Sequence, residues 1–339
     1  RALFARVGTL RLGVAARTGM IILVTQRLAQ AVPVMFLATI GVFLLLHLLP
    51  GDPAALMAGS DAPPATIEFV RHDMGLDQPL PVQYVIWLGH IARGDLGKSV
   101  FSKLPVGQLI GQRAPATIEL AVVGELLTVL IALPLGVAAA VKQRTPLDWL
   151  ISSTTSIGLA IPNFWLGILL ILLFAVALGW LPPGQRGDLL RDPLAELKFL
   201  ALPAFTLALP LAMNLSRLTK ASVLEVLYED HVRTARAKGL ADLAVINRHV
   251  LRNALVPIVT AISLDVGRLL GGALIVETIF AWPGLGTLML TAVGNRDYVI
   301  VQACLLLLVG VFILVNLIAD LSYGFLDPRI RLAAGGRRT

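Results

Sequence analysis

The short segment GDLGKS, residues 94–99, ends in the glycine, lysine and serine with which phosphate-binding loops end. Such a loop also needs a glycine five residues before Gly97, where this chain has Ala92, together with a preceding strand and a cytoplasmic position. We expect none of these conditions to be met. The chain is therefore predicted to bind no ATP, Mg²⁺ or other cofactor, and any ATP-driven work must be done by a partner.

Metal-binding and catalytic patterns are also missing from the sequence. It contains neither HExxH nor CxxC, and no convincing order of serine, histidine and aspartate for hydrolysis. The five histidines stand in separate segments: His47, His72, His90, His231 and His249. Because acid–base chemistry requires groups that converge, we expect no metal site and no enzyme activity.

Polar residues inside apolar stretches are stronger candidates for function. Asp265 and Arg268 are three residues apart, which places them on one face of a helix, where they can pair. Charges at membrane depth commonly mark a transport path, so the pair either neutralises itself inside a bundle or lines a polar passage. Asn214 is a weaker candidate, as are Glu119 and Glu125, which are expected at the interface or in hydrogen bonds between helices.

A second candidate site is the charged segment EDHVRTARAKGL, residues 229–240. Gly239 can end a helix in a left-handed cap and Asp242 can start the next, which predicts two short helices joined by a tight turn. Val232, Ala235 and Gly239 recur at three and four residues and form a ridge of small side chains on which another protein could pack. The alternative is a helix lying on lipid, but the segment lacks bulky apolar residues. The predicted contact residues are Glu229, Asp230, Val232, Arg233, Thr234, Ala235, Arg236, Ala237, Lys238 and Gly239.

Membrane-spanning helices must carry these residues. The 339 residues are 57% hydrophobic and only 14% charged, against roughly 25% charged in soluble domains. Six apolar runs have about the 20 residues that a helix needs to cross the hydrocarbon, whereas barrel strands would be half as long. The predicted spans are residues 28–49, 116–141, 150–178, 199–216, 254–276 and 299–319. We expect an all-α integral membrane bundle whose third span bends at Pro162.

The distribution of Lys and Arg predicts how the bundle is oriented. One set of connections carries 18 of these residues and the other carries 9, so the richer set is assigned to the cytoplasm. The cytoplasmic set includes the N-terminal segment 1–27, the segment 217–253 and the tail 320–339; the external set includes the lobe 50–115 and the loop 277–298. The net charge of +7 is accordingly interpreted as membrane topology and not as a nucleic-acid surface. The first apolar run is longer than a signal-peptide core, so it is kept as a span.

Several motifs together resemble the permeases of bacterial ABC importers, specifically the dipeptide, oligopeptide and nickel branch. The segment RTARAKG at 233–239, followed by RHVLRNALVP at 248–257, is similar to the loop through which such permeases couple to their ATPases. The usual glycine of that loop is matched by Gly239, while its usual Glu-Ala-Ala opening is absent. The other similar stretches are LLPGDPAA (48–55), RGDLGKS (93–99), IPNFWLG (161–167), GWLPPG (179–184), ETIFAWPGLG (277–286), DYVIVQA (297–303) and YGFLDPRIR (323–331).

The resemblance implies a type I importer permease fold with a coupling-helix pair between the fourth and fifth spans. It also implies partners: a homologous second permease subunit, two cytoplasmic ATPase subunits or one fused ATPase that bind ATP and Mg²⁺, and an external solute-binding protein that delivers a peptide. The chain would then be a translocation subunit in the bacterial plasma membrane, with both termini cytoplasmic. Asn214, Asp265 and Arg268 would meet the cargo during alternating access. Nickel or another small solute as cargo, an ion-coupled secondary transporter, and a membrane receptor or scaffold are the alternatives.

Overall fold

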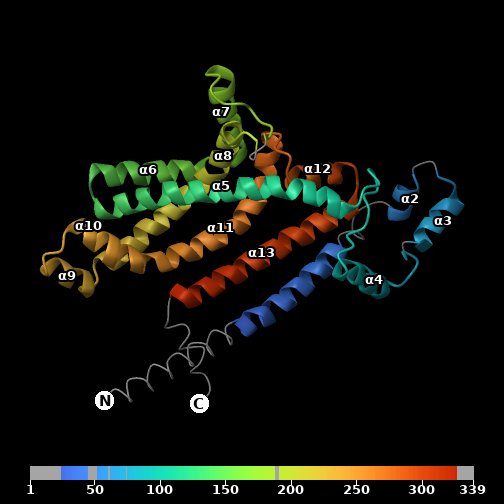
Figure 1. Ribbon diagram of the computed structural model, residues 1–339, viewed down its shortest axis with the longest axis horizontal. Coiled ribbons are helices and arrows are strands. Elements are labelled where there is room, and N and C mark those ends of the chain that lie inside the picture. The colour runs from blue at the N-terminus through green and yellow to red at the C-terminus, as the bar shows by residue number, and fades with distance from the viewer. Residues whose placement is uncertain (1–23, 45–51, 60–61, 74, 188–190, 327–339) are drawn as a thin grey trace, which may run out of the picture.

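The computed structural model describes residues 24–44, 52–59, 62–73, 75–187 and 191–326 (Figure 1). In this part of the chain every regular element is helical, and the one extended pairing is an isolated antiparallel bridge between Lys98 and Pro105. His47, residues 1–23 of the predicted N-terminal segment and residues 327–339 of the predicted tail lie outside the described residues. The described chain is all-α, as predicted.

The described helices include five that are long and apolar enough to cross a membrane, and a sixth crossing if the bent pair at residues 146–177 is one span. The five are Val24–Leu44, α5 (Val106–Val141), α8 (Pro193–Leu227), the continuous helix Asp242–Ile279 and Tyr298–Ile318. The continuous helix consists of α10 (Asp242–Val245), the π-helical turn η2 (Ile246–Val250) and α11 (Leu251–Ile279), and the last span belongs to α13 (Tyr298–Leu326). The predicted six-helix membrane fold agrees with this arrangement.

Two of the helices extend well beyond their apolar segments. α5 starts at Val106, ahead of its predicted start, and α8 continues to Leu227, past its predicted end. The 36 residues of α5 measure about 54 Å at 1.5 Å per residue, whereas the hydrocarbon is about 30 Å thick. In the last turns of α8, Val223 and Val226 are buried against other helices, which stabilises the extension. The first part of the predicted cytoplasmic segment 217–253 is therefore continuous with α8.

The third predicted span is broken at Pro162, where the sequence predicts a bend. Its halves are α6 (Pro146–Ala160) and the pair formed by α7 (Asn163–Leu170) and the π-helical η1 (Ile171–Ala177). The halves meet at 102°. Ile161 has φ −81° and ψ 120°, an extended conformation, because proline disfavours the helical conformation in the residue before it. A straight helix over this span is therefore excluded, and α7 stands out from the bundle in Figure 1.

Small residues bring α5 and α8 close together. A Cβ atom at Gly136 of α5 would lie 2.6 Å from the carbonyl oxygen of Ser216 and 2.5 Å from Cβ of Thr219, both on α8. Thr128 of α5 also donates a hydrogen bond from Oγ1 to the carbonyl oxygen of Ala208 at 3.3 Å. Such close approach is how helices associate in lipid, where burial of apolar surface provides no driving force between them. The backbones of α5 and α8 are consequently in near contact.

The short helices lie at the two ends of the long ones. α9 (Asp230–Ala237) and α10 lie at one end, and α2 (Pro53–Ala58), α3 (Pro64–Asp73), α4 (Leu80–Ala92) and α12 (Leu285–Gly294) lie at the opposite end (Figure 1). α3 and α4 contain no buried residues, so the lobe formed by α2–α4 has little core of its own. Tyr84 of α4 attaches the lobe to the helix Val24–Leu44, since its hydroxyl lies 2.8 Å from Thr39 Oγ1.

The segment that resembles a phosphate loop has a structural role. The element before it is the helix α4 and not a strand. Ser99 donates a hydrogen bond from Oγ to Asp297 Oδ2 at 2.5 Å, and the backbone amide of Phe101 donates to the same oxygen at 3.3 Å. Because Asp297 directly precedes α13, these bonds attach the lobe to the start of that helix. Gly97 has φ +80°, in the left-handed region that favours glycine.

Replacing Gly136 by alanine is expected to destabilise the bundle, because the new Cβ atom would overlap a backbone oxygen of α8. Overpacking of this kind costs about 1–3 kcal/mol in the free energy of unfolding. The midpoint of thermal unfolding of the purified protein in detergent measures the loss. Gly111→Ala is the matched control on the same helix, since nothing lies within 4 Å of its new atom. Equal midpoints for the two variants would contradict the close packing of α5 on α8.

Candidate functional site: α9 and the charges within the bundle

The charged segment folds into the predicted pair of short helices. α9 ends at Ala237, and Gly239 has φ +78°, the left-handed conformation expected of a glycine that terminates a helix. α10 starts at Asp242, and Ala241 occupies the N-cap position. The turn between the two helices is therefore as tight as the sequence indicates.

Val232 and Ala235 do not form the outward ridge that their spacing suggested. Their side chains are 0% and 5% exposed, and they belong to one apolar cluster with Val226 of α8 and Val250 of η2. An eight-residue helix has a single apolar stripe, and the chain's own bundle covers it. The prediction that these two side chains contact another protein is therefore wrong in this structure. They hold α9 against its own chain.

The outward side of α9, which we call its outer face, is polar and mainly basic. Its exposed residues are Arg233, Thr234, Arg236, Ala237, Lys238 and Gly239, preceded by the exposed Glu229 and Asp230. Arg233 lies 3.8 Å from Asp230, and Arg236 lies 3.7 Å from Asp242. Exposed pairs of this kind contribute little to stability, so their charges are available to another surface. The surface that the segment offers is charged, with Ala237 and Gly239 as its small members.

Asp265 and Arg268 form the expected ion pair on α11. Arg268 donates from Nη1 to Asp265 Oδ1 at 3.0 Å. The side chain of Asp265 is 1% exposed, whereas that of Arg268 is 58% exposed. The pair thus neutralises a buried carboxylate, which is one of the two possibilities that the sequence left open, and it presents a cation at the surface of the chain.

Glu125 of α5 lies beside this part of α11. Its neighbour Gly124 packs against Leu269, whose Cδ2 atom is 3.6 Å from the Cβ position of the glycine. Both carboxylate oxygens of Glu125 are buried and have no hydrogen-bond partner among the described residues. The expected hydrogen bond between helices is therefore not formed, and a buried carboxylate remains next to the ion pair.

The remaining weak candidates lie elsewhere. Asn214 of α8 has an exposed side chain and makes no hydrogen bond to the ion pair. Glu119 of α5 accepts a hydrogen bond from Nε of Arg186 at 2.9 Å, which joins α5 to the loop that precedes α8. The structure thus brings together only Asp265 and Arg268 of the predicted passage residues.

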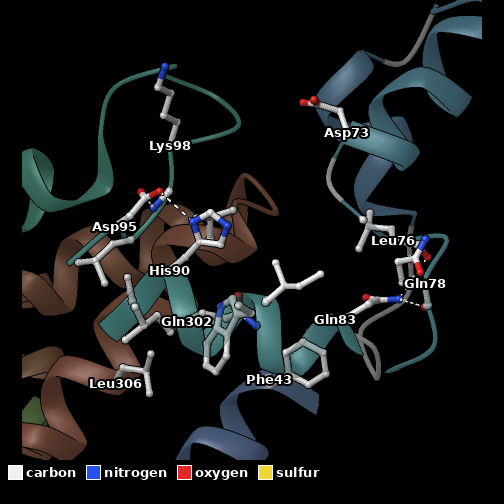
Figure 2. A pocket seen from close by; sticks show the side chains of 18 of the residues that line it. Phe43, Asp73, Leu76, Gln78, Gln83, His90, Asp95, Lys98, Gln302 and Leu306 are labelled. Carbon is white, nitrogen blue, oxygen red and sulfur yellow. Dashed lines mark hydrogen bonds and ion pairs between the residues drawn. The ribbon is translucent and has the colours of Figure 1, made fainter. Parts of the chain in front are cut away.

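A cavity of about 660 Å³ lies at the other end of the bundle, where the lobe meets the helix Val24–Leu44 and α13 (Figure 2). Phe43 contributes apolar surface, and Figure 2 places His90 and Asp95 on one side and Asp73 on the other. His90 Nδ1 lies 3.2 Å from Asp95 Oδ2. The backbone amide of Gly97, and then the hydrogen bond with His90, hold the pKa of Asp95 below its usual value. The cavity is therefore lined by apolar surface and by polar groups, among them Asp95, whose lowered pKa favours the ionised carboxylate.

Comparison with known proteins identifies the family. Residues 132–332 match the family described as the binding-protein-dependent transport system inner membrane component, and residues 20–121 match the N-terminal part of such a membrane component. The chain belongs to this family. The resemblance to ABC importer permeases is thereby confirmed, and the chain is a multi-pass protein of the inner membrane. Family membership also implies ATPase and solute-binding partners in general.

The permease is similar to curated relatives over nearly its whole length. It is 42% identical over 309 residues to a putative peptide transport system permease protein of Brucella abortus (strain 2308), which covers 91% of this chain and 98% of the relative. It is 43% identical over 306 residues to the glutathione transport system permease protein GsiC of Pectobacterium atrosepticum, covering 90% and 97%. A chain of the MetNI methionine ABC transporter, solved in inward-facing conformations, matches with a TM-score of 0.54 and 21% identity over 65% of this chain and 97% of that chain. This last similarity shows the fold.

Glu277 is a structural centre of the permease that the sequence did not single out as a site. Its buried carboxylate accepts hydrogen bonds from Thr117 Oγ1 at 2.5 Å, from the Gly286 amide at 2.7 Å and from the Thr287 amide at 3.1 Å. The Leu285 amide donates to Thr117 Oγ1 at 2.8 Å. One carboxylate thus joins the end of α11 to the start of α12 and to α5. The available signal was an acidic residue at the end of an apolar span, followed by a glycine-containing turn.

Glu277→Gln should destabilise the permease, because the amide group would turn a donor toward groups that themselves donate. Each hydrogen bond to a charged group contributes about 1.5–3 kcal/mol, and we expect the loss of at least one. The unfolding midpoint in detergent measures the effect. Glu68→Gln is the control, since its side chain is 72% exposed and should tolerate the same change. A midpoint for Glu277→Gln as high as that of the control would contradict the role of this carboxylate.

Proposed function

We propose that the permease is the translocation subunit of an ATP-driven importer that moves di- or oligopeptides across the bacterial plasma membrane by alternating access. It pairs with a homologous second permease, couples to two ATPase subunits or one fused ATPase, and receives cargo from an external solute-binding protein. ATP and Mg²⁺ bind to the ATPase partners, and this chain catalyses no reaction.

The observation that carries the proposal is the construction of α9. The helix is seated on the bundle by Val232 and Ala235, and it presents a charged outer face at one end of the long helices. A partner that pushes on this face must also move α8 and η2, because close-packed side chains cannot be compressed. A flexible loop would dissipate the same push. The outer face therefore suits the transfer of motion from ATPases to the bundle.

The proposed orientation places α9 in the cytoplasm and the lobe of α2–α4 outside. The excess of Lys and Arg on the connections that include residues 217–253 supports it. The cavity of the lobe then opens on the side from which the solute-binding protein delivers its cargo.

Peptide cargo is supported by the names of the relatives, one a peptide permease and one a permease for glutathione, which is itself a peptide. Arg268 offers a cation that suits the carboxylate end of a peptide, while Asp265 keeps its guanidinium in place. Spans two to five line the passage, and Asn214 adds an amide for the peptide backbone. Nickel is the alternative cargo.

Reversal of charge on the outer face should release the ATPases. An ATPase surface that complements the basic outer face carries negative charge. Arg236→Glu combined with Lys238→Glu would therefore place like charges opposite each other, and we expect at least a tenfold loss of ATPase subunits in co-purification. The inserted amount of permease, measured by immunoblot, should not change, because neither side chain is buried. Arg93→Glu, at the opposite end of the bundle, is the control. Full retention of the ATPases by the double variant would refute docking on α9.

Removal of both charges of the ion pair should weaken cargo transfer. The double variant Asp265→Asn with Arg268→Gln leaves neither member of the pair as a charge without its partner, so the bundle should remain folded. In the complete complex in lipid, we expect several-fold lower uptake of a peptide with a free carboxylate and a smaller loss for the same peptide with an amidated end. Unaltered uptake of both peptides would exclude the pair from the passage. ATPase stimulation by Ni²⁺ and not by peptide would assign the alternative cargo.

A further inference from the structure

His231, in the first turn of α9, lies against residues of η2 and α11. Its Nδ1 atom lies 2.9 Å from Glu229 Oε2. Its Nε2 atom lies 3.2 Å from Nδ2 of Asn253, on α11, and 3.4 Å from the carbonyl oxygen of His249, in η2. Nδ2 of Asn253 also donates to that carbonyl oxygen at 3.1 Å. Residues far apart in the sequence therefore meet in one small polar network.

The chemistry of the four groups determines how the hydrogens are arranged. The Glu229 carboxylate can only accept and Nδ2 of Asn253 can only donate, so we assign the ring hydrogen to Nδ1. Nε2 then has a lone pair that accepts from one N–H of Asn253. The second N–H of Asn253 donates to the His249 carbonyl, which leaves the contact between Nε2 and that carbonyl as a meeting of two acceptors. Each donor of the network thus has an acceptor, and we call the bond from Asn253 to His231 the α9–α11 bridge.

The bridge gives α9 a directional contact, which its apolar packing on the bundle does not provide. Val232 and Ala235 hold the helix on the bundle, but apolar contact is non-directional and allows a short helix to roll or slide. A hydrogen bond specifies both distance and direction. The C-terminal end of α9 runs into the loop at Gly239. The bridge, which lies near the N-terminal end of α9, therefore fixes the direction in which the outer face points.

Asn253 lies on the same continuous helix as the ion pair of Asp265 and Arg268. The helix runs from Asp242 to Ile279, and Asp265 follows Asn253 by twelve residues, or about 18 Å along the axis at 1.5 Å per residue. The π-helical turn η2 precedes Asn253 on this helix, and such turns inside α-helices occur frequently at functional sites. A displacement of α9 that is passed through the bridge would therefore act directly on the helix that carries Asp265 and Arg268.

We propose that His231 is a positioning residue of the coupling site: through the α9–α11 bridge it locks α9 to α11, so that movement of the outer face becomes movement of α11. This inference rests on the proposed docking of ATPases on α9. The side chain of His231 is 38% exposed, so the bridge contributes little to folding, and its effect is on transport.

The test uses the complete complex in lipid and measures peptide uptake and ATP hydrolysis in parallel. His231→Ala and Asn253→Ala should each lower the number of peptides imported per ATP hydrolysed by about three- to tenfold, while the ATPases still co-purify. Because both substitutions remove one shared interaction, the double variant should lose no more than either single variant. His231→Gln should recover most of the ratio, since its side-chain oxygen can accept from Asn253.

Gln143→Ala is the matched control. It removes a comparable hydrogen bond at the same end of the bundle, from the Tyr228 hydroxyl to Gln143 Oε1 at 2.9 Å, without touching α9 or α11. The control should keep the peptide-to-ATP ratio of the original permease. A drop in the control as large as in the His231 variants would overturn the proposal, because it would show general sensitivity of this end of the bundle.

These measurements distinguish failure of the α9–α11 bridge from failure of the proposed docking of ATPases on α9. If the charge-reversed outer face loses the ATPases while His231→Ala and Asn253→Ala import normally per ATP, docking stands and the bridge has no role in coupling. Independent losses in the two single variants, which multiply in the double variant, would also overturn the bridge. If the charge-reversed variant keeps its ATPases, the docking proposal itself fails, and with it the premise of the bridge.

Discussion

The close approach of α5 and α8 sets where the other helices of the permease can lie. Lipid tails are as apolar as leucine side chains, so no hydrophobic force presses helices together within a membrane, and geometric fit must supply the attraction. Gly136 provides that fit by allowing the backbone of α8 to lie against α5. α11 packs against both helices, and α6 is joined to α8 through Lys220, which bonds to Asp148 and to Ser152. The glycine-mediated contact between α5 and α8 is thus central to the bundle.

α11 connects the parts of the permease that we propose to act in coupling and transport with the turn that begins α12. Near its start, Asn253 contacts α9; in its middle, Asp265 and Arg268 form their ion pair; at its end, Glu277 holds α12. A helix is stiff along its axis, so a displacement at one end is felt at the other. Motion that enters at α9 could therefore reach both the charges in the bundle and the turn that begins α12 without a separate relay.

The buried carboxylates of the bundle differ in how they are satisfied. Asp265 is paired with an arginine, and Glu277 accepts two backbone amides and a hydroxyl. Glu125 has no partner in the described chain, although it lies beside the ion pair. An unpaired carboxylate is costly in a low-dielectric interior, so the surroundings of Glu125 are incomplete among the described residues. Its position near Asp265 gathers polar groups in one part of the bundle.

Local patterns in the sequence determined the membrane helices, the break at Pro162, the left-handed turn at Gly239 and the pairing of Asp265 with Arg268. Each of these depends on residues within a few positions of one another, so periodicity and spacing suffice to predict them. Only the tertiary structure decided that Val232 and Ala235 face inward, that His231 meets Asn253, and that Glu277 receives the start of α12. An amphipathic stripe shows that one side of a helix will be covered but not by what, because the covering surface comes from segments distant in sequence and is decided by which helices can approach most closely.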